Sequence, residues 1–196
     1  LLELAGLEAN DGVLTVAPEG MLERTGNLIS GDLRQVPWGR YSHAVVALLN
    51  EGERSSVVLL QTADASAVTK SNNVAGEPRD TLTFTSVSPL AVGELPDGVS
   101  NSSLQLGGAM LRSAQMAGAM SKAMELSSNY AAERKQFGRP IAKFQAIQQQ
   151  LAIMAEQTAA ANVASESACS ASDSHLNAFR IAAAKIATSD GASEAA

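Results

Sequence analysis

The chain has a single cysteine among its 196 residues, and aromatic (4%) and charged (17%) side chains are scarce. One cysteine forms no intrachain disulfide and excludes a zinc site built from several cysteines. The net charge of −6 argues against general nucleic-acid binding, which requires a surplus of lysine and arginine. The longest apolar run, residues 44–49, is too short for a membrane span. No signal-peptide pattern is visible, so we expect a cytoplasmic protein, or one of the mitochondrial matrix if the source is eukaryotic.

Alanine is abundant instead, with 35 residues, of which 25 follow residue 100. Five of the six prolines precede that residue. Alanine has the highest helix propensity and allows helices to approach closely, whereas proline is typical of loops and strand edges. The composition therefore predicts an α+β fold. We expect an antiparallel β-domain, a small barrel or sandwich, over residues 1–99 and an antiparallel helical bundle over residues 100–196.

Short apolar stretches within four segments of the first half predict strands, and segments that contain glycine predict turns that separate the stretches. The strands are expected at residues 27–36, 42–49, 55–60 and 80–87. The turns are expected at residues 30–32, 50–53 and 76–78.

Apolar residues three and four positions apart predict three helices in the second half, over residues 102–137, 142–171 and 175–188. Gly138 and Pro140 are expected to end the first helix. The third helix is expected to face the bundle through one apolar stripe. This stripe consists of Leu176, Phe179, Ala183 and Ile186. The pattern reaches Ala196 without a stop signal, so we expect part of a longer chain.

Four basic residues lie within ten positions where the first helix gives way to the second: Arg134, Lys135, Arg139 and Lys143. Together with the free N–H groups of a helix N-terminus they can form an anion pocket. Phe137 and Phe144 would add flat apolar surface for a ligand that carries phosphate and an aromatic ring. The same residues also suit a structural role, in which the cations complement the helix dipole and the rings belong to the core.

The segment from Tyr130 to Gln148 resembles the signature of the acyl-CoA dehydrogenase family, with nearly every anchor residue in place. Residues 83–89 resemble the strand that ends the family's β-domain, and residues 12–19 and 27–38 resemble its earlier segments. The resemblance covers the middle β-domain and the first helices of the C-terminal domain. It implies a flavoprotein that uses FAD to oxidise an acyl-CoA thioester.

The resemblance also implies roles for the residues of the signature. Arg134 matches the arginine that contacts the FAD pyrophosphate of a neighbouring subunit. Gln136 and Phe137 match positions beside the same FAD, and Phe144 and Ile147 match positions at its adenosine end. An oligomer is therefore expected, either a dimer or a tetramer, homo- or hetero-oligomeric.

The β-domain departs from the family pattern near the flavin. Thr15 matches a residue that hydrogen-bonds the flavin pyrimidine edge. The family's Trp-Ile-Thr triplet aligns with Gln35, Val36 and Pro37, and proline supplies neither a hydroxyl nor an N–H. Trp38 is expected either to replace part of the lost aromatic wall or to lie in the core.

No catalytic base is visible. The base of some family members aligns with Gly108, and that of others would follow Ala196. Glu125 and Glu133 are misplaced for this role and are expected to be solvated. Arg112 is either a shifted contact for CoA or a surface arginine.

No metal site is expected either, since His43 and His175 have no partner at ligand spacing. Cys169 is expected to be a packing residue. The pair Gly107–Gly108 is expected to allow close approach of helices.

Three hypotheses follow. The first is an FAD-dependent acyl-CoA dehydrogenase subunit that forms a trans-2-enoyl-CoA and passes electrons to electron-transfer flavoprotein or a similar acceptor. The second is a non-catalytic subunit that completes the FAD site of a partner. The third is an acyl-CoA oxidase on the same fold.

Overall fold

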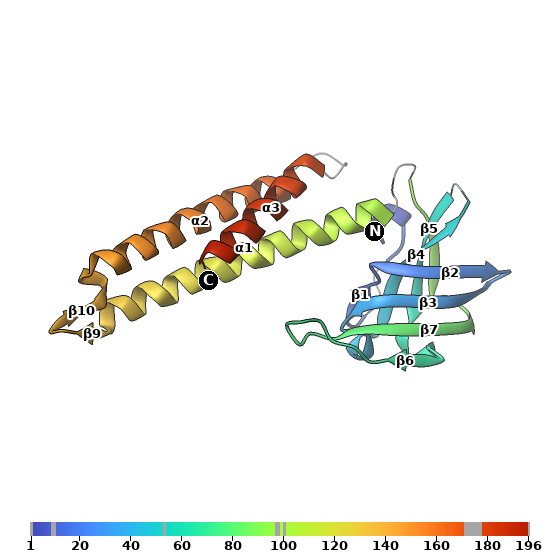
Figure 1. Cartoon of the computed structure of the whole chain (residues 1–196). Coiled ribbons are helices and arrows are strands. Elements are labelled where there is room, and N and C mark those ends of the chain that lie inside the picture. Colours follow the sequence, from blue (N-terminus) through green and yellow to red (C-terminus); the bar gives the residue numbers. More distant parts are fainter. Residues whose placement is uncertain are drawn as a thin grey trace. The chain divides into compact units, whose positions relative to one another are not determined.

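The computed structural model describes residues 2–8, 11–52, 54–96, 99, 101–170 and 178–195. It divides into two compact units, Leu1–Leu104 and Gln105–Ala196. Strands dominate the first unit and helices the second (Figure 1). The α+β class expected from the sequence is confirmed, and the division falls a few residues after the expected boundary.

The first sheet has the strand order β1-β4-β5-β8. Its strands are β1 (Leu14–Val16), β4 (Ala44–Glu51), β5 (Arg54–Gln61) and β8 (Ala91–Glu94). All neighbours are antiparallel except β1 and β4, which pair in parallel with Leu14 opposite Ala44. This parallel pair departs from the purely antiparallel pattern that was expected.

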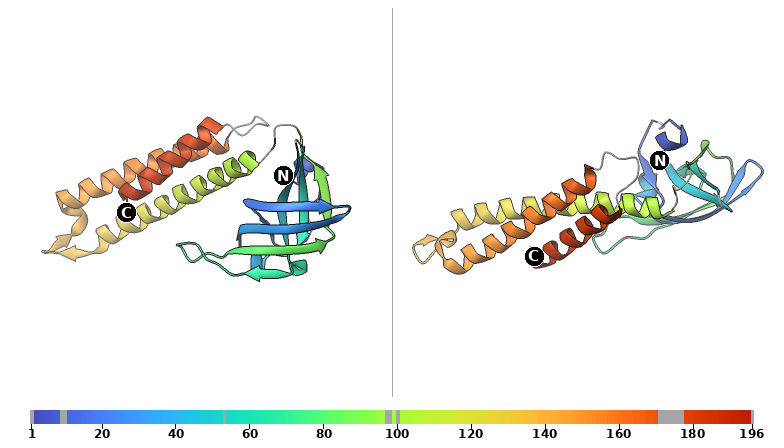
Figure 2. Two further views of the ribbon diagram at one scale, coloured as in Figure 1. Left: turned by 45° about the vertical axis from the view of Figure 1, so that its right-hand side comes forward. Right: turned by 90° about the horizontal axis from the view of Figure 1, so that it is seen from above.

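The second sheet is antiparallel throughout, with the order β2-β3-β7-β6. Its strands are β2 (Glu19–Thr25), β3 (Leu28–Pro37), β7 (Arg79–Val87) and β6 (Ala67–Thr69). Short 3-10 helices lie at Glu3–Ala5, Gly39–Tyr41 and Thr62–Asp64. Figure 2 shows the two sheets facing each other, and one apolar core contains residues of both. The β-unit is therefore a sandwich.

Strand β4 explains the longest apolar run of the sequence. Val45, Ala47 and Leu49 face the core between the two sheets. The alternate residues, Ala44, Val46 and Leu48, face a second core on the other side of their sheet. A strand that is buried on both faces needs no polar alternation.

The four expected strands are present as β3, β4, β5 and β7. The turn expected at residues 30–32 is wrong, because these residues lie inside β3. Gly31 has φ 135 and sits where the register between β3 and β7 shifts, which marks a bulge in a continuous strand.

The helical unit consists of α1 (Asn101–Glu133), α2 (Gln145–Cys169) and α3 (Ala178–Ala195). The three run antiparallel in succession (Figure 1). Small side chains form much of the bundle core, in two clusters of buried residues. The clusters are Ala117, Met120 and Ala161, and Ala168, Ile181 and Ala184. Alanine at these contacts lets the helices approach closely, in line with the composition.

The apolar stripe expected on the third helix does not face the bundle. Phe179 and Ile186 are 81% and 62% exposed, Ala183 is exposed, and Leu176 lies outside the described residues. The buried positions of α3 are Ile181, Ala184, Thr188 and Gly191. A Cβ at Gly191 would lie 3.1 Å from the Met120 Cε. Apart from Ile181, close helix contact therefore places small residues at the buried positions of α3.

None of the described helices is long and apolar enough to cross a bilayer.

A buried hydroxyl in the helical bundle allows a test of its effect on stability. The buried Thr158 hydroxyl meets no hydrogen-bond partner among the described residues. Thr158→Val keeps the shape and removes this group, so we expect the free energy of unfolding to rise by about 1 kcal/mol. The measurement is urea unfolding followed by circular dichroism. Thr188→Val is the matched control, since the Thr188 hydroxyl donates to the Ala184 carbonyl at 2.8 Å. An equal gain in both variants would contradict the explanation.

Candidate functional site

The family-like signature forms a tight hairpin between α1 and α2. Helix α1 ends at Glu133, before the expected stop. Strands β9 (Lys135–Gln136) and β10 (Arg139–Pro140) pair, with Gln136 opposite Arg139. Both residues of the connecting turn, Phe137 and Gly138, have positive φ values (52 and 80). Positive φ at both positions is typical of a type I′ turn. The expectation that α1 extends to Phe137 is therefore wrong.

The turn presents an aromatic side chain to solvent. Phe137 is 90% exposed, and its ring meets that of Phe144 edge to face at a centroid distance of 6.1 Å. The Arg139 guanidinium carbon lies 4.3 Å from the Phe144 ring centroid, within cation–π range. A positive φ at a non-glycine residue costs about 1–3 kcal/mol. The hairpin thus holds this exposed ring beside cations at a cost in backbone strain.

Arg134 follows the last residue of α1, and its N–H donates to the Tyr130 carbonyl at 2.8 Å. The side chains of Arg134 and Gln136 are exposed, and those of Phe144 and Ile147 are half-buried. Among the described residues, no hydrogen bond or ion pair involves the Arg134 guanidinium. The signature therefore offers an available cation next to a partly exposed aromatic pair.

Helix α2 adds backbone donors to this cluster. Its N-cap is Phe144, and no side chain caps the first turn. The first backbone N–H groups of a helix lack acceptors within the helix, and they carry its positive dipole end. An anionic group can bind here without displacing a capping side chain.

In the β-unit, the two expected flavin-site residues lie close together. The Thr15 hydroxyl donates to the Pro37 carbonyl at 2.5 Å, and Trp38 follows Pro37. Thr15 is buried, and Trp38 is 50% exposed. The Thr15 hydroxyl hydrogen is already used, so its lone pairs remain for an external donor. The alternative that Trp38 belongs to the core is wrong.

A charged network that sequence reasoning missed supports the residues after Trp38. The Asp80 carboxylate is fully buried. It accepts from the Arg40 N–H at 2.9 Å and from the Arg40 Nε at 3.0 Å, and the Arg40 Nη2 lies 2.7 Å from its other oxygen. The Ser71 N–H donates to it at 3.2 Å. Burial raises the pKa of Asp80, but these hydrogen bonds and the charge of Arg40 outweigh burial and hold the pKa below its usual value.

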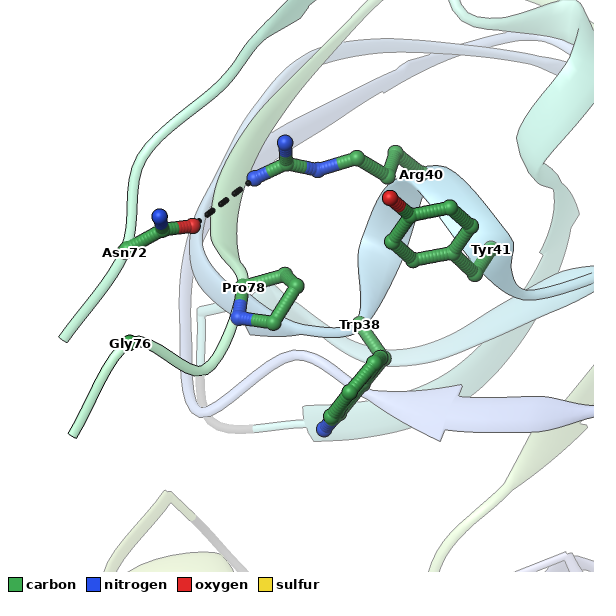
Figure 3. A pocket seen from close by; sticks show the side chains of 6 residues that line it. All are labelled: Trp38, Arg40, Tyr41, Asn72, Gly76 and Pro78. Carbon is green, nitrogen blue, oxygen red and sulfur yellow. Dashed lines mark hydrogen bonds between the residues drawn. The ribbon is translucent and has the colours of Figure 1, made fainter.

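Arg40 of this network also lines an open hollow of about 430 Å³ (Figure 3). Its lining comes from two loops of the β-unit. The lining residues are Trp38, Arg40, Tyr41, Asn72, Gly76 and Pro78. Arg40 and Asn72 are joined across the hollow by a hydrogen bond of 3.2 Å. The two loops are distant in sequence, so no local motif marked this site.

The two glutamates considered for the catalytic base are both solvated, as expected. Glu133 is exposed at the end of α1, and Glu125 forms an exposed ion pair with Lys122 at 2.7 Å. Arg112 is an exposed residue whose Nη1 donates to Gln115 at 2.8 Å.

A Cβ at Gly107 or Gly108 would meet no atom within 4 Å. The expectation that this pair allows close helix approach is therefore wrong.

The described residues contain no cluster of three potential metal ligands, and His175 lies outside them. His43 is exposed. Cys169 is exposed as well, so the expectation that it packs in the core is wrong.

The fold and the signature hairpin define a class of protein, a β-sandwich followed by an antiparallel helical bundle. The model of the acyl-CoA dehydrogenase C-terminal domain matches residues 99–196. The chain belongs to the acyl-CoA dehydrogenase family. It is 32% identical over 107 residues to acyl-CoA dehydrogenase IpdE2 of Mycolicibacterium smegmatis, a match that covers 53% of this chain and 33% of the relative.

Solved structures share the fold across nearly the whole chain. A steroid acyl-CoA dehydrogenase variant, Tcur3481-Tcur3483 G363A, matches with a TM-score of 0.74 and 23% identity over 93% of this chain and 54% of its own. The ChsE4-ChsE5 complex of Mycobacterium tuberculosis matches with a TM-score of 0.73 and 20% identity, over 94% and 54%. At these identities the likeness shows the fold alone. The chain spans about half the length of these structures and a third of the curated relative.

Proposed function

We propose that the protein is an FAD-dependent acyl-CoA dehydrogenase that converts an acyl-CoA thioester to the trans-2-enoyl-CoA. Electrons would leave to electron-transfer flavoprotein or a similar acceptor. The observation that carries the proposal is the signature hairpin, with an available arginine next to a partly exposed aromatic pair and an uncapped helix N-terminus.

The donor set fits an anionic dinucleotide such as FAD. Arg134 would bind the pyrophosphate of a neighbouring subunit's FAD, since a guanidinium pairs well with phosphate oxygens. Gln136 and Phe137 would lie beside it, and Phe144 and Ile147 would pack at its adenosine end. The chemistry that FAD supplies when bound is acceptance of a hydride from the acyl chain.

The β-unit would position the flavin ring. In the conformation described, Thr15 would accept a hydrogen bond from the flavin pyrimidine edge, because its own hydrogen is held by the Pro37 carbonyl. Trp38 would contribute an aromatic wall. These roles follow from the residues that Thr15 and Trp38 match in the family, and each can be tested by mutation.

Arg134→Ala tests the proposal. Loss of a charge-assisted hydrogen bond costs about 1.5–3 kcal/mol, so the Kd for FAD should rise about 10- to 100-fold. Flavin fluorescence titration of the purified protein measures it. Arg34→Ala is the matched control, because Arg34 is an exposed arginine of the β-unit. Equal affinity in the two variants would remove Arg134 from the cofactor site.

A second candidate function is a non-catalytic subunit that completes the FAD site of a partner. Gly108 stands where some relatives carry the base, and one structural neighbour was solved as a complex of two proteins. Co-purification with a homologous subunit distinguishes the two. Flavin bound by the purified protein alone, bleached by acyl-CoA, supports the dehydrogenase. Flavin bound only after co-expression supports the partner role.

A further inference from the structure

The backbone is strained where β3 ends and Trp38 begins the next turn. Gln35 and Trp38 both have φ 53, in the left-handed region that favours glycine. Residues other than glycine remain in this region only where the surrounding structure holds them there. Pro37 lies between the two, and its carbonyl accepts the Thr15 hydroxyl hydrogen. The segment that presents Trp38 therefore depends on contacts from outside its own backbone.

The buried Asp80 carboxylate supplies such contacts from β7. Asp80 lies opposite Val36 in the pairing of β7 with β3. One of its oxygens accepts from the Arg40 N–H at 2.9 Å, two residues after Trp38. Gly39 is buried against it, since a Cβ at Gly39 would lie 3.4 Å from the Asp80 Cβ. A hydrogen bond and close packing thus both fix the backbone that follows Trp38.

The Arg40 side chain connects the carboxylate to the aromatic rings of the turn (Figure 3). Its Nη2 lies 2.7 Å from an Asp80 oxygen, and its guanidinium carbon lies 5.8 Å from the centroid of the Tyr41 ring, within cation–π range. The Tyr41 ring lies 6.0 Å from the Trp38 ring at a tilt of 48°, a separation typical of interacting aromatic pairs. A continuous series of contacts therefore leads from Asp80 to the Trp38 ring.

The same pair joins this turn to the loop before β7. The Arg40 Nη2 donates to the Ser71 carbonyl at 2.9 Å and to the Asn72 side chain at 3.2 Å. The Ser71 N–H donates to the Asp80 carboxylate at 3.2 Å. The planar fork of arginine allows these bonds to form at once, which a lysine cannot reproduce. Loss of the Asp80 charge would therefore loosen both segments together.

We propose that Asp80 is a positioning residue, which acts through Arg40 to hold Trp38 in place before a ligand binds. The inference rests on the proposed function in taking Trp38 as a wall of the cofactor site. It adds Asp80 and Arg40, to which the family resemblance assigns no role. A wall that is already ordered loses little entropy on binding. Release of Trp38 should therefore weaken binding although no residue that contacts the ligand is removed.

The position of Trp38 can be measured without a cofactor, because all tryptophan fluorescence arises at this residue. Asp80→Asn and Arg40→Lys are compared with wild type by time-resolved anisotropy, after circular dichroism shows that each variant is folded. We expect the nanosecond component, which reports local motion of the ring, to gain amplitude in both variants. Arg40→Lys keeps a positive charge beside Asp80, so it tests the proposal even if Asp80→Asn does not fold.

Glu77→Gln is the matched control, because it removes a neighbouring ion pair of the same length, Glu77 with Arg79 at 2.7 Å, and leaves Asp80 and Arg40 unchanged. An anisotropy decay in either test variant that equals that of Glu77→Gln overturns the proposal.

Titration with FAD gives the second measurement. The Kd should rise about 10-fold in the test variants, because the aromatic side chains must then be ordered on binding, and it should stay unchanged in Glu77→Gln. A looser Trp38 with unchanged affinity for FAD also overturns the proposal. A wild-type protein that binds no FAD contradicts the proposed function instead, whereas the anisotropy still shows whether Asp80 holds Trp38.

Discussion

Asp80→Asn should lower the free energy of unfolding of the β-unit by about 3 kcal/mol, since removing one member of a buried ion pair leaves the other charge uncompensated. Asp80 is fully buried, and Arg40 directs its N–H, its Nε and its Nη2 toward it. Asparagine retains the size but loses the charge. Urea unfolding followed by Trp38 fluorescence measures the loss in the unit that contains the pair.

The same network determines how the stability contribution of Asp80 changes with pH. The pKa of Asp80 is lower in the folded protein than its usual value, so its contribution is fully present above about pH 4. It is lost as the pH falls through the folded pKa. The stability difference between wild type and Asp80→Asn should therefore stay constant from pH 7 to pH 5 and shrink only at lower pH.

Asp64→Asn is the control for both measurements. Asp64 is exposed in the 3-10 helix Thr62–Asp64, and surface substitutions of this kind stay within about 0.5 kcal/mol. An Asp80→Asn variant as stable as Asp64→Asn would show that the network does not stabilise the fold. A difference that shrinks already between pH 7 and pH 5 would mean that the folded pKa is raised.

The β-unit could be predicted where burial leaves a strong pattern. The central strands β3, β4, β5 and β7 contain long apolar stretches and were expected at nearly the observed bounds. Strand β2 was missed because Leu22 is its only buried residue. Its pairing with β3 depends on a two-residue turn at Gly26 and Asn27 rather than on apolar residues.

The helices were predictable in number and order, but the face that the third helix turns toward the bundle was not. The large apolar residues of the third helix suggested a stripe toward the bundle, and Phe179 and Ile186 point outward instead. Besides Ile181, the buried positions are occupied by smaller residues such as Ala184 and Gly191. Helix packing here depends on how closely the helix backbones approach each other. The spacing of large apolar residues along the sequence does not indicate that distance.

The candidate site likewise has one part that the sequence indicated and one part that it did not. The signature placed Arg134, Phe137 and Phe144 on one short segment, so the sequence alone indicated their proximity. Arg40 and Asp80 are forty residues apart in sequence, and only the pairing of β3 with β7 brings them together. The pocket that they support could not be read from local spacing.

Gly31→Ala is expected to destabilise the β-unit by at least about 4 kcal/mol, a large part of the roughly 5–15 kcal/mol that stabilises a typical folded domain. Two effects add. With φ 135, Gly31 lies in a region that costs other residues about 1–3 kcal/mol. An added Cβ would also lie 2.0 Å from the Met21 carbonyl oxygen. That oxygen belongs to the backbone of β2, so relief of the clash requires the β2–β3 ladder to open.

Gly26→Ala separates the two effects. Gly26 also has a positive φ, at 62, but a Cβ there would meet no atom within 4 Å. This variant should lose only about 1 kcal/mol, the cost of a left-handed conformation. The difference between the two variants, measured by thermal and urea unfolding with soluble yield as a second readout, isolates the close approach of β2 to the bulge. Equal losses in both variants would mean that β2 moves aside freely, and that the bulge at Gly31 does not fix the path of β3 toward Pro37 and Trp38.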